Sequence, residues 1–421
     1  MNARTDKPRI DLLITNAAAV LTVAELAEDL VGWIPGGAVA VAGERIAAVG
    51  PPADVLARVD AGGAQIVDAT GRVVAPGFVD CHTHVVFGGS RAAEYAAGCT
   101  MSIEQVEALG IPTGIAATME MTRRESEESL VAGASARLDG MFRAGTTTVE
   151  SKSGYGLRTA DELKMLRVNS SLAETHPVDI VSTLLGAHAF PPDMGSDEYV
   201  DAVVEEMIPQ AAELGLAEFC DVFCEVGYFD VEQSRRILRA GMKAGLKPKI
   251  HVDEYTDMGG GAMAAELGVI SADHLNYTPR ETMRLMGDRG VIGVVMPALD
   301  FAVGHTHPFD ARAMMAEGMT VALATDMCPG CWCESMQVVM QLACRLYGLT
   351  PAEALRCATL NAARAIGRGD DRGSLEAGKL ADIQLWNVGS LDEVIYRIGN
   401  NAVEAVVRRG KLYKFSGYVC G

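Results

Sequence analysis

The chain has few positive charges and no long apolar run. Among its 421 residues, 36 are Lys or Arg and 55 are Asp or Glu, which gives a formal net charge of −19. Nucleic acids and anionic membranes both attract clustered cations, so we expect neither as a partner. Gly, Asp or Glu interrupts every apolar run well short of the roughly 18 residues that a membrane helix needs.

Signals for secretion and for phosphate binding are also missing. The first residues lack the apolar core of a secretory signal, so we expect a cytoplasmic protein. In a reducing compartment most of its ten cysteines would be thiols, and their irregular spacing is unlike a disulfide framework. The glycine run at 259–261 lacks the Lys and Ser/Thr of a phosphate-binding loop.

Three segments of the chain differ in texture. Residues 1–75 and residues 372–421 contain short β-forming runs between Gly, Asp and Pro, and we expect them to form one small β-sandwich domain together. Residues 76–371 alternate short apolar runs with longer amphipathic ones. The run at 161–174 is typical of an outer helix.

The central segment contains eight candidate strands, each followed by enough residues for a helix. Repeated β–α alternation predicts an α/β fold with a parallel sheet, and eight repeats favour a (β/α)8 TIM barrel. A doubly wound sheet is the alternative, although it needs no fixed count of eight. The candidate strands are FVDCHTH, TTTVESK, VSTLLGAH, CDVFCE, KPKIHVDE, ISADHL, GVIGVVMP and MTVALATD.

Histidines gather at the ends of these candidate strands, where a barrel carries its chemistry. His82 and His84 are two residues apart, so on a strand both imidazoles face the same side and can reach one ion. His251 and Asp326 end two further strands, and divalent metals accept imidazole and carboxylate together. We therefore predict a metal site formed by His82, His84, His251 and Asp326.

Two more strand-end residues are candidates for proton transfer. Glu254 follows His251 by three residues, close enough to exchange a proton with a metal-activated water without being a ligand. His274 can hydrogen-bond the reacting carbonyl or the water, and Asp326 can accept a proton as well as bind metal. The alternatives are a surface Glu254 in a polar loop and a core His274 bonded to a neighbouring strand.

These residues stand in stretches that resemble a known superfamily. PGFVDCHTH at 76–84, SADHL at 271–275, ATD at 324–326 and GKLADI at 378–383 resemble the amidohydrolase superfamily of metal-dependent barrel hydrolases. Within it the chain is most similar to the imidazolonepropionase family of histidine degradation. That likeness is carried by HVVFGGSRAAEY at 84–95, ESKSGYGL at 150–157, LLGAHAFPP at 184–192, DVFCEVGYF at 221–229 and AAELGVISADHL at 264–275.

The resemblance implies an activity and a substrate site. It implies one divalent metal, zinc or iron, and hydrolysis of a five-membered cyclic amide such as imidazolone-5-propionate by metal-activated water. By the same resemblance Arg91, Tyr155 and His188 hold the substrate and the enzyme is a homodimer. A guanidinium suits a carboxylate-bearing substrate because the two pair in a bidentate fork. We expect Tyr155, which is flanked by Gly154 and Gly156, to sit on a flexible loop. The alternatives are a surface ion pair for Arg91 and an aromatic that packs on the rim for Tyr155.

The chain departs from the family pattern in three stretches that we expect to wall the pocket. Residues 99–118 carry Met101 and Pro112 where the family usually has a tyrosine-bearing segment and a glycine-rich loop. An asparagine-bearing turn usually follows the strand-eight aspartate, but here the chain reads MCPGCWC at 327–333. The loop after strand seven carries an extra His305-Thr306-His307.

The cysteines of the second stretch allow several interpretations. Cys328, Cys331 and Cys333 could form a second metal site with His305 or His307, act as redox-sensitive lid thiols, or be small buried residues beside Trp332, which we favour. Soft side chains would also suit a substituted ring, such as a thioxo or hydantoin-type analogue. Two rivals to ring opening remain: a heterocycle aminohydrolase that deaminates its substrate, and a non-catalytic barrel that only binds.

Overall fold

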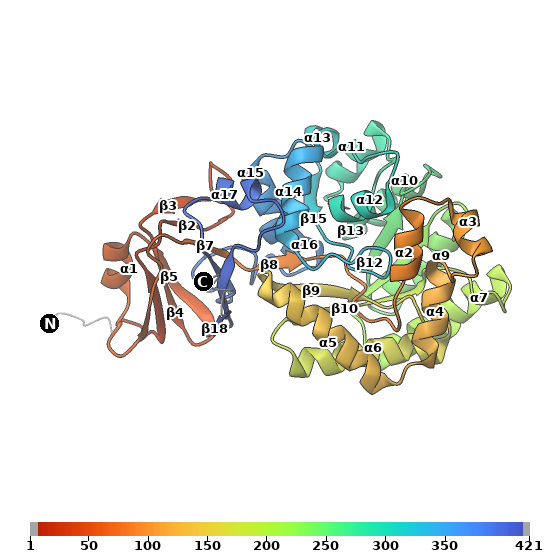
Figure 1. Ribbon diagram of the computed structural model, residues 1–421, viewed down its shortest axis with the longest axis horizontal. Coiled ribbons are helices and arrows are strands. Elements are labelled where there is room, and N and C mark those ends of the chain that lie inside the picture. The colour runs from red at the N-terminus through yellow and green to blue at the C-terminus, as the bar shows by residue number, and fades with distance from the viewer. Residues whose placement is uncertain (1–6, 416–421) are drawn as a thin grey trace. The chain divides into compact units, whose positions relative to one another are not determined.

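The computed structural model describes residues 7–415 (Figure 1). They divide into two compact units. One holds the described residues up to Asp80, then Met141–Thr147, then the described residues from Ser335 onward, and the other holds Cys81–Gly140 and Thr148–Glu334. The domain boundaries expected after residues 75 and 371 stay predictions.

An eight-stranded sheet forms the centre of the fold, and its neighbouring strands follow chain order. From the second strand to the eighth, each strand pairs in parallel with the next. The strands are β8 (Phe78–Asp80), β9 (Thr146–Lys152), β10 (Asp179–Ala187), β11 (Phe219–Cys224), β12 (Lys247–Val252), β13 (Ser271–His274), β14 (Ile292–Val295) and β15 (Thr320–Leu323).

The sheet closes on itself just beyond its first and last strands. The His84 amide donates to the Met327 carbonyl (2.8 Å), and the Asp326 amide donates to the His82 carbonyl (3.1 Å). The predicted TIM barrel is confirmed and the doubly wound alternative is wrong, because an open sheet would leave these two edges apart. All eight predicted strands are present, although β8 ends at Asp80, so His82 and His84 follow the strand instead of lying on it.

Helices follow the strands and surround them in Figure 1. The predicted helix at 161–174 is confirmed as α6 (Thr159–Thr175), which packs on β10. Helix α9 (Val231–Lys243) begins at a capping box, in which the Asp230 side chain accepts a hydrogen bond from the Gln233 amide and the Gln233 side chain accepts one from the Asp230 amide. The other helices between Ala92 and Ala316 are α2 (Ala92–Gly98), α3 (Ile103–Ala108), α4 (Gly114–Arg124), α5 (Glu127–Arg143), α7 (Ser196–Ala202), η1 (Val203–Met207), α8 (Ile208–Glu213), α9 (Val231–Lys243), α10 (Gly260–Leu267), α11 (Arg280–Asp288), α12 (Pro297–Val303) and α13 (Ala311–Ala316).

The two ends of the chain share the larger of two further sheets, as the sequence predicts, and the smaller one consists of N-terminal strands. In the six-stranded sheet, β7 (Val73–Pro76) from the N-terminal segment pairs antiparallel with β16 (Ile383–Trp386) from the C-terminal segment. Its order is β18 (Lys411–Lys414), β17 (Val403–Arg408), β16 (Ile383–Trp386), β7 (Val73–Pro76), β2 (Ala19–Leu21) and β3 (Trp33–Pro35). The four-stranded sheet has the order β5 (Arg45–Gly50), β4 (Ala38–Ala42), β1 (Leu12–Thr15) and β6 (Gln65–Asp68).

Alternating small apolar residues give these sheets a common core. Val39 and Val41 of β4 pack with Leu12 and Ile14 of β1 and with Ile383 and Val407 from the other end of the chain. The same unit contains α1 (Pro52–Arg58), α14 (Met336–Leu346), α15 (Pro351–Arg356), η2 (Cys357–Asn361), α16 (Ala362–Ala365) and α17 (Leu391–Tyr396). Within residues 7–415, no helix is both long and apolar enough to cross a bilayer.

Candidate active site

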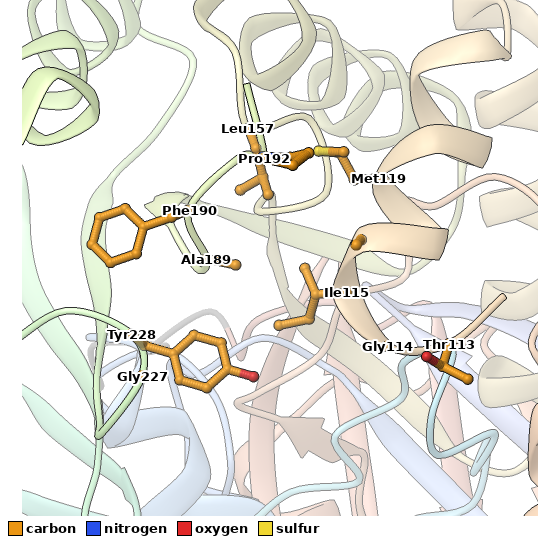
Figure 2. A pocket seen from close by; sticks show the side chains of 11 residues that line it. Thr113, Gly114, Ile115, Met119, Leu157, Ala189, Phe190, Pro192, Gly227 and Tyr228 are labelled. Carbon is orange, nitrogen blue, oxygen red and sulfur yellow. The ribbon is translucent and has the colours of Figure 1, made fainter. Parts of the chain in front are cut away.

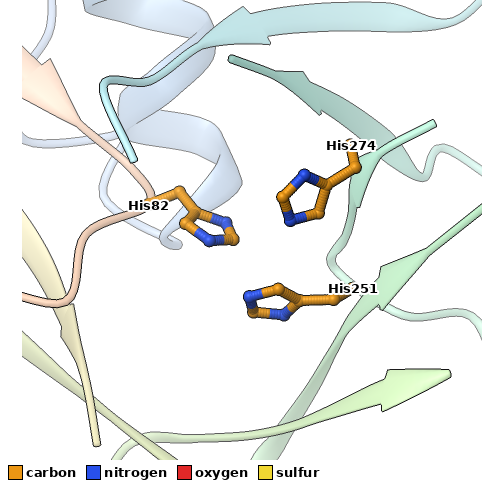
Figure 3. Close-up of side chains that lie close together, drawn as sticks. All are labelled: His82, His251 and His274. Carbon is orange, nitrogen blue, oxygen red and sulfur yellow. The ribbon is translucent and has the colours of Figure 1, made fainter. Parts of the chain in front are cut away.

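Three histidines, one just after β8 and the others on β12 and β13, face one another at the carboxyl ends of the barrel strands (Figure 3). The ring centroids of His82 and His251 are 4.4 Å apart, and those of His251 and His274 are 5.1 Å apart. One nitrogen from each of the three lies within 4.8 Å of the others. Residues almost 200 positions apart in the sequence therefore converge on one point.

His84 and Asp326 join the same cluster. Asp326 Oδ1 lies 3.7 Å from His82 Nε2 and 3.7 Å from His84 Nε2, and His82, His84 and Asp326 offer ligand atoms within 4.8 Å of one another. Asp326 and His274 both have positive φ, 48° and 81°, a conformation that is uncommon for residues other than glycine and gathers at functional sites. The backbone is thus bent where these side chains turn inward.

The histidine nitrogens suit a divalent cation. The Nε2 atoms of His82, His251 and His274 are buried and have no hydrogen-bond partner among the described residues. Buried polar atoms without a partner destabilise a fold, so these nitrogens fit a site that binds a ligand. Burial, and after it Lys152, lowers the pKa of His82 and His251 well below the ordinary value, so both are neutral, as metal-binding imidazoles must be. With a carboxylate beside them, these are the nitrogen and oxygen donors that zinc and related metals take.

Two carboxylates behind the cluster fix the orientation of two of its imidazole rings. His82 Nδ1 lies 2.7 Å from Asp273 Oδ2, and His251 Nδ1 lies 3.1 Å from Asp221 Oδ1. Because each carboxylate accepts the Nδ1–H, the lone pair of each Nε2 points to the centre of the cluster. The sequence reasoning gave Asp221 and Asp273 no role. The signal for them was a charged residue inside an otherwise apolar strand run.

One buried lysine connects these carboxylates. Lys152 Nζ lies 2.7 Å from Asp221, 3.0 Å from Glu150 and 3.4 Å from Asp273, and none of the four side chains is exposed. Burial alone would lower the pKa of Lys152, but Asp221, Glu150 and Asp273 raise it, so the ammonium stays charged. Lys249 neutralises the second Glu150 oxygen from 2.8 Å. The barrel interior below the cluster is therefore an ion-pair network.

Glu254 is buried at the edge of the cluster and is not a surface residue. It is 6% exposed, and its Oε2 lies 3.7 Å from His274 Nδ1. Burial, with further contributions that include nearby Asp326, raises the pKa of Glu254 to about 8. The Glu225 carboxylate accepts hydrogen bonds from the backbone amides of the two residues after Glu254, Tyr255 (2.9 Å) and Thr256 (3.2 Å). The loop that carries Glu254 is thus tied down.

The predicted substrate-binding residues line a cavity of about 200 Å³ above the cluster. The His188 ring stacks on His84 with centroids 5.0 Å apart, and Tyr155 lies 5.2 Å from His188. Arg91 also lines this cavity. Its Nε and Nη2 donate to the Glu94 carboxylate at 2.6 Å each, so Arg91 forms an ion pair and faces the cavity as well. Of the nine predicted site residues, only His82 is absent from the lining, since it lies deeper in the cluster.

An apolar hollow of about 310 Å³ adjoins this cavity and shares Gly114, Ile115 and Tyr228 with it (Figure 2). Leu157 and Phe190 complete its wall. The cavity is thus polar at its base and apolar at this side.

The divergent loops do lie at the cavity. Cys328 and Gly330 are in its wall, and Met101 lines a wider outer hollow that also contains Arg91 and Tyr255. The amides and carbonyls of Cys328 and Cys331 hydrogen-bond reciprocally at 3.0 and 3.1 Å across the Pro-Gly turn. None of the metal-competent clusters in the described range includes a cysteine, so a second metal site is not supported. His305 instead donates from Nε2 to the Glu254 carbonyl (2.9 Å), and His307 stacks on Tyr277.

Comparison with known proteins matches this architecture to a family. The model of the amidohydrolase family matches residues 73–413. The chain belongs to the amidohydrolase family. Curated relatives of this amidohydrolase include imidazolonepropionases from Geobacillus kaustophilus (46% identity over 414 residues, 96% of each chain), Symbiobacterium thermophilum (45% over 424 residues, 97% of this chain and 99% of the relative) and Halobacterium salinarum (46% over 380 residues, 89% and 91%).

Solved structures share the fold of this amidohydrolase at lower identity. A zinc-bound adenosine deaminase from Xanthomonas campestris aligns with a TM-score of 0.71 at 23% identity, covering 97% of this chain and 93% of that one. Atrazine chlorohydrolase from Arthrobacter aurescens TC1, complexed with zinc, aligns with a TM-score of 0.68 at 21% identity, covering 95% and 94%. The amidohydrolase superfamily is metal-dependent, in agreement with the donor set described above.

The ion-pair network makes a prediction about metal affinity in this amidohydrolase. Replacing Lys152 with Met leaves Asp221 and Asp273 without their shared ammonium, so both imidazoles lose a fixed orientation. We expect metal affinity, measured by chelator competition on the metal-free protein, to fall about 10- to 100-fold. The comparison variant is Lys249→Met, which removes an equally buried lysine that acts on Asp221 and Asp273 through its charge but donates its hydrogen bonds to Glu150 and to the Cys81 carbonyl. Equal metal affinities in the two variants would contradict this role for Lys152.

Proposed function

We propose that this amidohydrolase opens the ring of imidazolone-5-propionate by hydrolysis of its cyclic amide. The observation that carries the proposal is a pair of donor clusters that share His82, one with His251 and His274 and one with His84 and Asp326, at the base of a cavity whose wall contains Arg91. The naming of its relatives as imidazolonepropionases at 44–46% identity supports the same substrate. The net reaction forms a C–O bond from water, breaks the ring C–N bond and places a proton on the released nitrogen.

We propose zinc as the metal, held by His82, His84, His251 and Asp326, with iron as the alternative. A divalent metal in this position supplies Lewis acidity, which lowers the pKa of water and polarises a carbonyl oxygen. Neutral imidazoles and a carboxylate suit either ion. Metal analysis of the purified protein distinguishes the two.

Glu254 is proposed as the proton carrier. A carboxylate whose pKa is raised to about 8 exchanges protons readily near neutral pH. It takes the proton of the attacking water and delivers it to the ring nitrogen as the C–N bond breaks. His274, whose pKa burial lowers to about 3, stays neutral and can donate Nδ1–H to Glu254 or Nε2–H to the reacting carbonyl.

Arg91 is proposed as the anchor of the propionate carboxylate. Two of its five N–H donors are held by Glu94, which fixes the plane of the guanidinium and leaves donors at Nη1 beside Gly330. A carboxylate can pair with that remaining edge. Tyr155 and neutral His188, which line the same cavity, are proposed to contact the ring, where His188 Nε2 is an acceptor for a ring N–H.

Substitution at the cluster and at Glu254 should separate metal binding from chemistry. We expect His251→Ala and Asp326→Asn to lose both metal and activity. Glu254→Gln keeps the metal but removes the proton carrier, so its kcat should fall about 10²- to 10⁴-fold. Metal content and steady-state ring opening, measured on the same preparations, test both statements. Near-normal turnover by the glutamine variant would refute the assigned role of Glu254.

Arg91→Lys should affect recognition of the carboxylate more than ring chemistry. Lysine lacks the planar fork, so we expect KM for imidazolone-5-propionate to rise about 10- to 100-fold while kcat changes little. The matched substrate is an imidazolone that lacks the propionate, for which wild type and variant should have similar kcat/KM. Equal loss on both substrates would place Arg91 outside carboxylate recognition.

A substrate panel tests the proposal against its rivals. Cys328 in the cavity wall favours a substituted ring as the second candidate substrate, so the panel includes imidazolone, hydantoin, 2-thiohydantoin and aminoheterocycle propionates. Ring opening fastest on the imidazolone is expected. Ammonia release without ring opening would favour the heterocycle aminohydrolase, and no turnover by metal-loaded protein would favour a binding module. The homodimer and the cytoplasmic location stay predictions.

A further inference from the structure

The loop that carries Tyr155 is organised by one buried carboxylate. Glu162, on the first turn of α6, accepts the Gly154 amide at Oε2 (2.8 Å) and the amides of Gly156 and Leu157 at Oε1 (2.7 and 2.8 Å). The Glu162 side chain is not exposed to solvent at all. A single side chain therefore accepts hydrogen bonds from three backbone amides next to Tyr155 in the sequence, those of Gly154, Gly156 and Leu157.

The carbonyls of the same loop also have fixed partners. Arg123 of α4 donates from Nε to the Gly156 carbonyl (2.7 Å) and from Nη2 to the Leu157 carbonyl (3.0 Å). The Gly154 carbonyl accepts the Nδ1–H of His188 (3.1 Å). Because Nδ1 carries the proton in neutral His188, Nε2 is the acceptor that remains for a ligand.

The glycines beside Tyr155 allow this close packing. A Cβ on Gly154, which has φ +107°, would lie 2.8 Å from His188 Nδ1, and a Cβ on Gly156 would lie 2.5 Å from the Glu162 amide nitrogen. The flexible loop expected from these glycines is therefore wrong. Both positions need the absence of a side chain so that the backbone can approach Glu162 and His188.

We propose that Glu162 is a positioning residue, which acts through the 154–157 backbone to hold Tyr155 and His188 in their substrate-contacting places. Tyr155 is 3% exposed, and its ring lies 5.5 Å from His84, so a small shift of the loop moves it relative to the cluster. A loop that is already ordered spares the substrate the cost of ordering it on binding. The inference rests on the proposed function only in assigning Tyr155 and His188 to the substrate.

The test is a set of variants on α6 and α4. Glu162→Gln keeps the shape, but its NH₂ group must face at least one of the three loop amides, which are also donors. The matched control is Asn169→Ala on the same helix, which removes buried hydrogen bonds to Ser151 and leaves the loop amides untouched. Arg123→Gln loosens the loop from its carbonyl side without burying an unpaired charge.

Two measurements separate positioning from general stability. Hydrogen exchange of the peptide spanning 153–158 should rise in Glu162→Gln and Arg123→Gln but stay at the wild-type level in Asn169→Ala. In the same two variants KM should rise about ten-fold while kcat and metal content stay within about two-fold of wild type. In a Tyr155→Phe background, Glu162→Gln should add less to KM than it does in the wild type.

Specific outcomes would overturn the proposal. Unchanged exchange at 153–158, an equal KM rise in Asn169→Ala, or full additivity with Tyr155→Phe would each do so. If Glu162→Gln does not fold, Arg123→Gln gives the same readouts and decides alone. The exchange experiment needs no substrate, so failure of the proposed ring opening, seen as absent wild-type turnover, is distinguishable from failure of the positioning role.

Discussion

The ammonium group of Lys152 is the interaction on which the active-site end of the barrel depends. It is fully buried and lies within 3.4 Å of three carboxylates, two of which hold the imidazoles of His82 and His251. Removing several charges from water is costly unless each finds a partner, and here each of these groups does. The barrel centre is therefore a polar network in place of the branched apolar layers usual in such barrels, and its geometry fixes the orientation of both imidazoles.

Two loops above the network are each held by a buried glutamate that accepts hydrogen bonds from several backbone amides. Glu162 holds the loop of Tyr155, and Glu225 holds the loop that follows Glu254. In both loops the hydrogen bonds to the glutamate come from the backbone and not from the side chain that faces the cavity, which is Tyr155 in one loop and Glu254 in the other. Its place is set by the hydrogen bonds of the neighbouring backbone.

Much of this arrangement was predictable from the sequence because it rests on local patterns. Eight apolar runs separated by helical ones specify the barrel, and strand-end histidines such as His251 then fall at the same edge. Asp221 and Asp273 were not predictable as partners, since the register between strands decides which imidazole each one meets. The glycines around Tyr155 gave the wrong expectation because glycine serves both flexibility and close approach, and only Glu162, six residues further on, distinguishes them.

Chemistry and recognition are built from different parts of this fold. The ion-pair network lies below the cluster on β9, β11, β12 and β13, whereas Cys328 and Gly330 belong to a turn in the cavity wall and Met101 to the outer hollow. The turn joins the cluster at Asp326, whose amide is bonded to the His82 carbonyl, so Cys328 can differ from the family pattern while the backbone at Asp326 stays fixed. Under the proposed function, changes in this wall bear on which ring enters the cavity, while the backbone bond between Asp326 and His82 stays in place.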